Sequence, residues 1–464
     1  MNVKRLLVTT LVLFGLSCNA VTQIFITPTP IPTATPTATL TPIPSATALS
    51  AGLYIPPGCQ SKPVATLPPA TLVAEPTLGP TPNPSISTAE QLRIFDALTH
   101  KISDVYLYPD FNGLDWKGTV ASYRAQVKAG LDTETFYNKM SELVIKLGDD
   151  HSSFLSPSEE TATNAEENGQ ISYVGIGVLV LPEPDKQRLT LLSVLPGSSA
   201  EHGGLKQHDS ILAVDGIPLY QNGIVHSERI RGPECSAEVL TVQSPGGQPR
   251  DIMFVRFRIT APLPIIARMV PTRDGSRIGY IFLPSFFDET IPGQVKKALQ
   301  GFGKLDGLII DNRMNGGGAS DILEPILGYF TSGVIGHFVS RKETRPLAIT
   351  ADPVQNSQKV PLVVMVSKDT VSFGEIFSGS LQDIGRAKIV GQTSAGNVEV
   401  LSGYKFEDDS RLWIAQESFD PLRSHAKWEG RGIIPDVAAY ADWDTFTFET
   451  DPSVLAAVKL LGHK

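Results

Sequence analysis

The sequence predicts an α/β protein with a helical N-terminal part and a β-rich insertion before the α/β core. Three observations support this class. Apolar residues recur at helical spacing between 88 and 165, short β-rich runs fill 173–258, and strands alternate with helical stretches after residue 278. Such alternation is typical of a layered α/β core. The length of 464 residues suits two or three domains.

The first residues indicate export. Lys4 and Arg5 precede an apolar run that is too short to span a bilayer but suits a signal peptide over residues 1–18. Gly15-Leu-Ser-Cys18 resembles a bacterial lipoprotein processing site, which predicts a lipidated Cys18 and a protein anchored to the cell membrane from outside. The alternative is an ordinary signal peptide with an incidental cysteine. Both interpretations predict an exported protein.

Residues 19–87 are predicted to form a disordered tether. Thr, Pro, Ala and Ser dominate this stretch, so it lacks the apolar residues that a core needs and favours extended conformations. Cys59 in the tether and Cys235 in a later loop permit a disulfide, although the fold does not require one.

Residues 88–169 are predicted to be mainly helical. Apolar residues from Ala89 to Val105 and from Phe136 to Leu147 follow a helical period. The second stretch ends in Gly148-Asp-Asp-His151, which places a histidine in a turn directly after a helix.

The β-rich insertion spans residues 170–259, and the core spans 260–464. In the core, helices are expected at 293–302 and 321–330, and strands at 305–311 and 361–367.

The apolar run at 361–367 leads into Ser372-Phe-Gly-Glu375, which opens a helical pattern. A serine there lies beside the free N–H groups of a helix N-terminus, where a nucleophile and an oxyanion are stabilised. The alternative is a serine that only caps the helix, with Glu375 completing a capping box.

Two further motifs flank this serine in the sequence. An apolar strand runs into Asp311-Asn-Arg-Met-Asn-Gly-Gly-Gly318, and consecutive glycines let backbone N–H groups approach a ligand closely. The second motif is Trp428-Glu-Gly-Arg-Gly-Ile-Ile-Pro-Asp436. Together the three motifs resemble those of the C-terminal processing (tail-specific) serine peptidase family, over about residues 88–464. The resemblance implies a crotonase-like layered peptidase core that cleaves peptide bonds.

One position departs from that family. Asn397 stands where the tail-specific enzymes have the lysine that serves as general base, and an amide cannot take that role. His151 resembles the base of the tricorn-like Ser/His branch, and its unperturbed pKa near ~6.5 suits proton transfer. Glu429 of this sequence occupies the position of a glutamate that, in the tricorn-like branch, helps to hold the histidine. His425 and Lys368 are weaker alternatives for the base.

The resemblance implies a set of catalytic residues. Ser372 is the expected nucleophile and His151 the base, and N–H groups of Gly317 or Gly318 and of Phe373 are expected to stabilise the oxyanion. Glu429 orients the histidine. Asp150 is a candidate for the remaining member, with Ser152 a weaker one.

The segment Leu195 to Gly216 closely resembles part of a PDZ domain. By the same resemblance, a loop and strand would bind the C-terminus of a peptide through backbone groups. A PDZ-like domain that only packs against the peptidase is the alternative. The expected peptide-binding residues are Tyr173, Val174, Gly175, Ile176, Gly177 and Val178.

Charge and histidine spacing limit the classes of partner and cofactor that the sequence predicts. A net charge of −9 without a basic run argues against nucleic acid, and the histidine spacing predicts no metal site and no cofactor. The expected function is that of an exported serine endopeptidase acting on proteins or peptides. The second hypothesis is a non-catalytic protein that binds peptides through its PDZ domain. The sequence does not indicate the oligomeric state.

Overall fold

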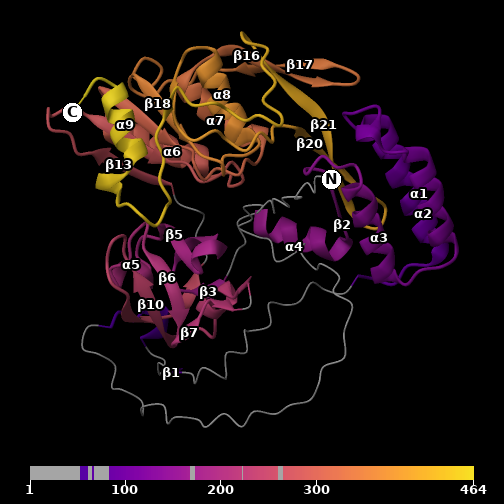
Figure 1. Ribbon diagram of the computed structural model, residues 1–464, viewed down its shortest axis with the longest axis horizontal. Coiled ribbons are helices and arrows are strands. Elements are labelled where there is room, and N and C mark those ends of the chain that lie inside the picture. Colours follow the sequence, from indigo (N-terminus) through magenta and orange to yellow (C-terminus); the bar gives the residue numbers. More distant parts are fainter. Residues whose placement is uncertain are drawn as a thin grey trace, which may run out of the picture.

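The computed structural model describes residues 53–60, 65–66, 83–167, 173–221, 223–259 and 265–463. Figure 1 shows helices at one side, a β-rich unit (residues 173–259) drawn in magenta, and a layered core in orange and yellow. The predicted signal peptide and Cys18 lie outside the described residues. Within the described ranges, each helix is too short or too polar to cross a membrane.

The helices in these ranges are α1 (Thr88–Val105), α2 (Trp116–Lys128), α3 (Thr133–Ile145), α4 (Pro157–Glu167), α5 (Ser199–His202), α6 (Ile291–Phe302), α7 (Ser320–Phe330), α8 (Phe373–Asp383) and α9 (Pro452–Leu460). The strands are β1 (Ala65–Thr66), β2 (Ser153–Leu155), β3 (Tyr173–Gly175), β4 (Val178–Glu183), β5 (Arg188–Val194), β6 (Ser210–Val214), β7 (Ile217–Pro218), β8 (Tyr220–Gln221), β9 (Ile224–Val225), β10 (Ser236–Gln243), β11 (Arg250–Val255), β12 (Phe257–Ile259), β13 (Ile266–Val270), β14 (Ile278–Phe282), β15 (Gly307–Asp311), β16 (Gly333–Ser340), β17 (Thr344–Ile349), β18 (Leu362–Val366), β19 (Lys388–Gly391), β20 (Val400–Lys405), β21 (Arg411–Pro421) and β22 (Val437–Ala438).

The core is built on a sheet with the order β13-β14-β15-β18-β19-β22, in which only the β13–β14 pair is antiparallel. Strands β14, β15 and β18 are buried on both faces, which explains their continuous apolar sequences. Leu308 and Ile310 pack toward α6, α7 and α8, whereas Ile309 packs toward α9. Helices therefore cover both faces of the sheet, and the predicted α/β class of the core is confirmed.

A second sheet connects the N-terminal helices to the core. Its order is β17-β16-β21-β2, and β20 also pairs with β21. Trp413 of β21 lies opposite Ser153 of β2 and opposite Gly403 of β20, so β21 runs between these two strands. Leu412 and Ile414 pack against α1, α2 and α3. The segments that precede β2 and β20 are thereby brought to one place, although they are far apart in the sequence.

The β-rich unit contains a sheet with the order β1-β10-β6-β5-β4, extended by β11 and β7. Strand β4 lies at the edge of this sheet, and β3 pairs separately with β12. The side chains of β5, β6, β10 and β11 enclose a small core of their own. The short β-rich runs of this region thus form the predicted β-rich unit.

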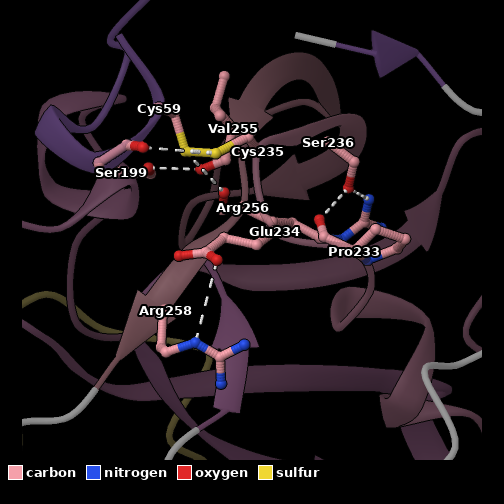
Figure 2. Close-up of a disulfide and its surroundings, with 10 residues drawn as sticks. Cys59, Ser199, Pro233, Glu234, Cys235, Ser236, Val255, Arg256 and Arg258 are labelled. Carbon is pink, nitrogen blue, oxygen red and sulfur yellow. Dashed lines mark hydrogen bonds and ion pairs between the residues drawn. A yellow bond between two sulfur atoms is a disulfide. The ribbon is translucent and has the colours of Figure 1, made fainter. Parts of the chain in front are cut away.

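A disulfide fixes part of the predicted tether to the β-rich unit. Cys59 and Cys235 are joined, with their Cα atoms 5.3 Å apart and both side chains buried (Figure 2). Tyr54, in the same segment, stacks on the His202 ring at 3.6 Å between centroids. The prediction of a disordered stretch over residues 19–87 is therefore corrected for 53–60 and for 65–66, which form β1 beside β10. Local composition did not reveal a cysteine and a tyrosine that pack against distant partners.

The β-rich unit also contacts the C-terminal part of the core. The indole nitrogen of Trp443 donates to the Leu191 carbonyl of β5 at 3.1 Å, and His208 Nδ1 lies 2.8 Å from the Trp443 carbonyl. The Arg313 guanidinium lies over the Trp443 ring, 4.6 Å from its centroid. One buried tryptophan thus touches both the β-rich unit and the strand end that leads to the glycine-rich loop.

Candidate active site

Ser372 occupies a strained turn between β18 and α8. Its backbone has φ +54° and ψ −125°, a conformation that non-glycine residues rarely adopt. Its N–H donates to the Asn397 carbonyl at 2.8 Å, and its carbonyl accepts from the N–H groups of Glu375 and Ile376. A serine held this way at the start of a helix resembles the strained nucleophile turn of hydrolases.

The alternative of a simple helix cap does not match this geometry. The Ser372 hydroxyl makes no capping hydrogen bond to α8. The Glu375 carboxylate instead accepts from Ser394 Oγ at 2.6 Å and from the N–H groups of Gly396 and Asn397 at 2.7 and 2.8 Å. Burial raises the pKa of Glu375 to about 7. Glu375 therefore fixes the turn that lies against Ser372.

The glycine-rich loop lies directly against the serine. A Cβ at Gly317 would lie 3.2 Å from Ser372 Oγ and 3.3 Å from Phe373 N, so a side chain there would fill the space beside the hydroxyl. The Gly317 N–H donates to Asn315 Oδ1 at 2.9 Å. Among the described residues, no acceptor takes the N–H of Gly318 or of Phe373. Of the N–H groups of Gly317, Gly318 and Phe373, those of Gly318 and Phe373 therefore remain free to meet an oxyanion.

His151 reaches the core because β2, two residues later, pairs with β21. Asp149 Oδ1 accepts from the backbone N–H of His151 at 3.1 Å and of Ser152 at 2.7 Å. The Ser152 hydroxyl donates to Asp149 Oδ2 at 2.6 Å and accepts from the Ala415 N–H of β21 at 3.0 Å. Asp149 and Ser152 thus hold the turn that carries the histidine.

Two carboxylates lie beside the imidazole. Ligand-type atoms of His151, Glu399 and Glu429 all lie within 4.8 Å of one another. Burial lowers the pKa of His151 to about 4, although the charges of Asp149 and Asp150 oppose that shift. Burial raises the pKa of Glu399 to about 8, and it also raises the pKa of Glu429. The imidazole is therefore neutral at neutral pH and able to accept a proton.

No hydrogen bond joins His151 to Ser372 among the described residues, and His151 Nε2 is buried without a partner. One short segment, residues 396–398, contacts both the Ser372 turn and the residues beside His151. Asn397 accepts from Ser372, Gly396 accepts from the N–H of Gly430 at 2.7 Å, and Val398 donates to Glu429 Oε2 at 2.8 Å. Residues 396–398 thus lie between the Ser372 turn and the Glu429 carboxylate beside His151.

The other candidates for proton transfer lie elsewhere. Asp150 is exposed, and its side chain makes no hydrogen bond within the described residues, so it influences the imidazole only through space. The Lys368 ammonium is exposed and pairs with Asp369 at 2.8 Å. His425 is also exposed and pairs with Asp420 at 2.9 Å.

Sequence reasoning missed Glu399. This residue is 2% exposed, and its Oε1 accepts a hydrogen bond from the Tyr108 hydroxyl. A glutamate two residues after the Asn397 position was the available signal, but no local pattern places it beside His151. The contact arises from the pairing of β2 and β20 with opposite edges of β21.

The predicted peptide-binding loop lies at the start of the β-rich unit. Ile176 and Gly177 connect β3 to the edge strand β4. Their carbonyls accept from Ala200 and Leu195, whereas among the described residues no acceptor takes their N–H groups. A side chain at Gly177 would lie 2.4 Å from Ser198 Cβ, and the φ of +88° also favours glycine.

Comparisons with known proteins relate the chain to one group of peptidases. Residues 277–439 match the model of peptidase family S41. The chain is 28% identical over 382 residues to the carboxyl-terminal-processing protease of Synechocystis, covering 81% of this chain and 87% of that protein. It is 27% identical over 296 residues to the carboxy-terminal processing protease CtpB of Bacillus subtilis, covering 63% and 60%. The fold is similar to that of the photosystem II D1 C-terminal processing protease, with a TM-score of 0.53, 20% identity and coverage of 79% and 97%.

Proposed function

Because the chain is a serine peptidase of family S41, we propose that it is an endopeptidase that works through an acyl-enzyme on Ser372, with His151 as the base. The observation that most supports this assignment is the strained Ser372 turn beside the two available N–H groups of Gly318 and Phe373. A serine hydroxyl and nearby N–H groups without an acceptor are the parts that acyl transfer requires.

In the proposed reaction, Ser372 Oγ attacks the peptide carbonyl and His151 accepts the hydroxyl proton. The oxyanion receives hydrogen bonds from Gly318 and Phe373, each contributing about 3 kcal/mol to the transition state. When the C–N bond breaks, His151 returns the proton to the leaving amine. Water then hydrolyses the ester by the reverse sequence. Glu429, fixed by the Val398 N–H, has a carboxylate oxygen within 4.8 Å of an imidazole nitrogen of His151 and would orient the ring.

We also propose that the β-rich unit is a PDZ domain that binds substrate C-termini. The free N–H groups of Ile176 and Gly177 suit a terminal carboxylate, and the open edge of β4 suits an added peptide strand. Export is a further part of the proposal. It is supported by the apolar N-terminal run and by the Cys59–Cys235 disulfide, which is typical of oxidising compartments.

The nucleophile is tested by Ser372→Ala in the purified protein. We expect loss of peptide hydrolysis and of labelling by a fluorophosphonate probe, because only an activated serine reacts with it. The melting temperature should change little, since the hydroxyl makes no capping bond to α8. Labelling that persists in Ser372→Ala would rule out this nucleophile.

A further inference from the structure

Three ionisable side chains, those of His151, Glu399 and Glu429, lie together in the described part of the structure. The three side chains come from the segment before β2, the segment before β20 and the loop after β21, and one ligand-type atom of each lies within 4.8 Å of the other two. An imidazole nitrogen and two carboxylates are ligands that Zn²⁺ accepts.

Two of these side chains have an atom without a partner. His151 Nε2 and Glu399 Oε2 are both buried and make no hydrogen bond within the described part of the chain. The Glu399 residue is only 2% exposed, so it is almost completely buried. A carboxylate oxygen buried in this way is unfavourable unless a donor or a cation meets it. The unpaired oxygen is thus an independent indication that this position binds a ligand.

The remaining contacts fix the orientation of the three side chains. Glu399 Oε1 accepts from the Tyr108 hydroxyl, and Glu429 Oε2 accepts from the Val398 N–H at 2.8 Å. The turn of His151 is held by Asp149. Metal ligands in proteins are typically oriented by such outer contacts, which leave the other ligand atoms free.

We propose that His151, Glu399 and Glu429 bind a Zn²⁺ ion. Glu399 would release its proton to solvent when the ion binds, and one neutral nitrogen and two carboxylates would then balance the charge of the dication. A set that includes a nitrogen favours Zn²⁺ over Ca²⁺ or Mg²⁺, which prefer oxygen alone. Ligands at about 2.0–2.2 Å from zinc lie about 3.4 Å apart in a tetrahedron. The set must therefore contract, by rotation of the two glutamate side chains, and the fourth position remains open.

The consequence for activity rests on the proposed function. A Zn²⁺ ion bound to Nε2 occupies the lone pair with which His151 would accept the Ser372 proton. Zinc should therefore inhibit the enzyme reversibly, and a chelator should restore its activity. Binding itself does not depend on the peptidase assignment, so the two parts can be tested separately.

The binding test uses the full chain carrying Ser372→Ala, which excludes self-cleavage. Zn²⁺ affinity is measured by competition with a chromophoric chelator, and Co²⁺ is added separately to record the visible absorption of its coordination sphere. Adding Glu399→Gln or His151→Ala should weaken Zn²⁺ binding by at least about tenfold and change the Co²⁺ spectrum. The control is His425→Ala, because His425 and Asp420 form an exposed histidine–carboxylate pair that is a plausible adventitious site. Circular dichroism establishes that each variant is folded.

The outcomes of these experiments distinguish the proposed Zn²⁺ site from the proposed peptidase function. Zn²⁺ binding that is lost in folded Glu399→Gln and kept in His425→Ala supports the site. Absence of binding, or equal binding in Glu399→Gln, overturns it. In the wild type, zinc binding at this site without inhibition would overturn the inhibitory role. A wild-type protein that is inactive even with chelator would instead contradict the proposed function and leave the binding result valid.

Discussion

Ser372 is held by backbone contacts rather than by its own hydroxyl. The Ser372 N–H donates to the Asn397 carbonyl, and the Ser372 carbonyl accepts from N–H groups of α8, so the hydroxyl is left without a structural role. The positive φ therefore persists because neighbouring segments enforce it. Backbone strain of this kind is common where a catalytic group must be presented.

Gly317 provides a test of the space beside that hydroxyl. Gly317→Ala places a Cβ 2.8 Å from Ser372 Cβ at a φ of +97°, so it obstructs the oxyanion space and strains the loop. We expect kcat/KM to fall at least about 10²-fold. The matched control is Gly301→Ala on α6, where a Cβ meets nothing within 4 Å. Equal kcat/KM values for both variants would contradict the arrangement.

The identity of the base is tested by comparing His151→Ala with Asn397→Ala. Removing the imidazole should lower kcat/KM on the order of 10³-fold. Asn397→Ala should cost far less, because Asn397 contacts Ser372 and Glu375 through its backbone, and its Oδ1 is buried without a partner. Steady-state kinetics on one peptide substrate measure both losses. Similar losses in the two variants would exclude His151 as the main base.

At the scale of elements, helices and buried strands were predictable and their pairing was not. The predicted helices at 293–302 and 321–330 correspond to α6 and α7, since local apolar spacing specifies them. The pairing of β2 with β21 joins Ser152 to Ala415 across 263 residues, and no local pattern encodes it. Ser372 and the glycines could therefore be proposed from sequence, whereas the position of Glu399 beside His151 became visible only with the sheet.

The disulfide is an element-scale constraint that can be removed cleanly. Replacing Cys59 and Cys235 by serine together should lower the free energy of unfolding of the β-rich unit by about 2–4 kcal/mol, because the cross-link restricts the unfolded chain. Chemical denaturation of both proteins measures the difference. Wild-type protein treated with reductant should approach the variant. An unchanged denaturation midpoint would mean that the segment contributes no stability.

At the scale of the whole molecule, His208 joins the β-rich unit to the core. It is buried against Trp443, and burial lowers its pKa to about 3. The unfolded chain, with a pKa near ~6.5, therefore binds a proton more readily than the folded chain as the pH falls. Stability contributed by neutral His208 is present above about pH 6.5 and declines toward pH 3, by up to about 1.4 kcal/mol per pH unit.

This pH dependence is tested with His208→Asn, since asparagine tolerates the backbone φ of +76° at this position. The variant should lose some stability at neutral pH and show a shallower decline between pH 6.5 and pH 3. Urea denaturation across that range measures both slopes. Parallel slopes for wild type and variant would show that His208 does not couple this contact to pH.

The Cys59–Cys235 bond also determines what a cut in the chain can do. It spans a sequence separation of 176 residues, and His151 lies inside the covalent ring that it closes. A single nick anywhere in that ring opens it without releasing a fragment. Such a nicked molecule would migrate as one species on a non-reducing gel and as two after reduction. A peptidase exposed to its own activity thereby keeps its histidine and its serine in one covalent assembly.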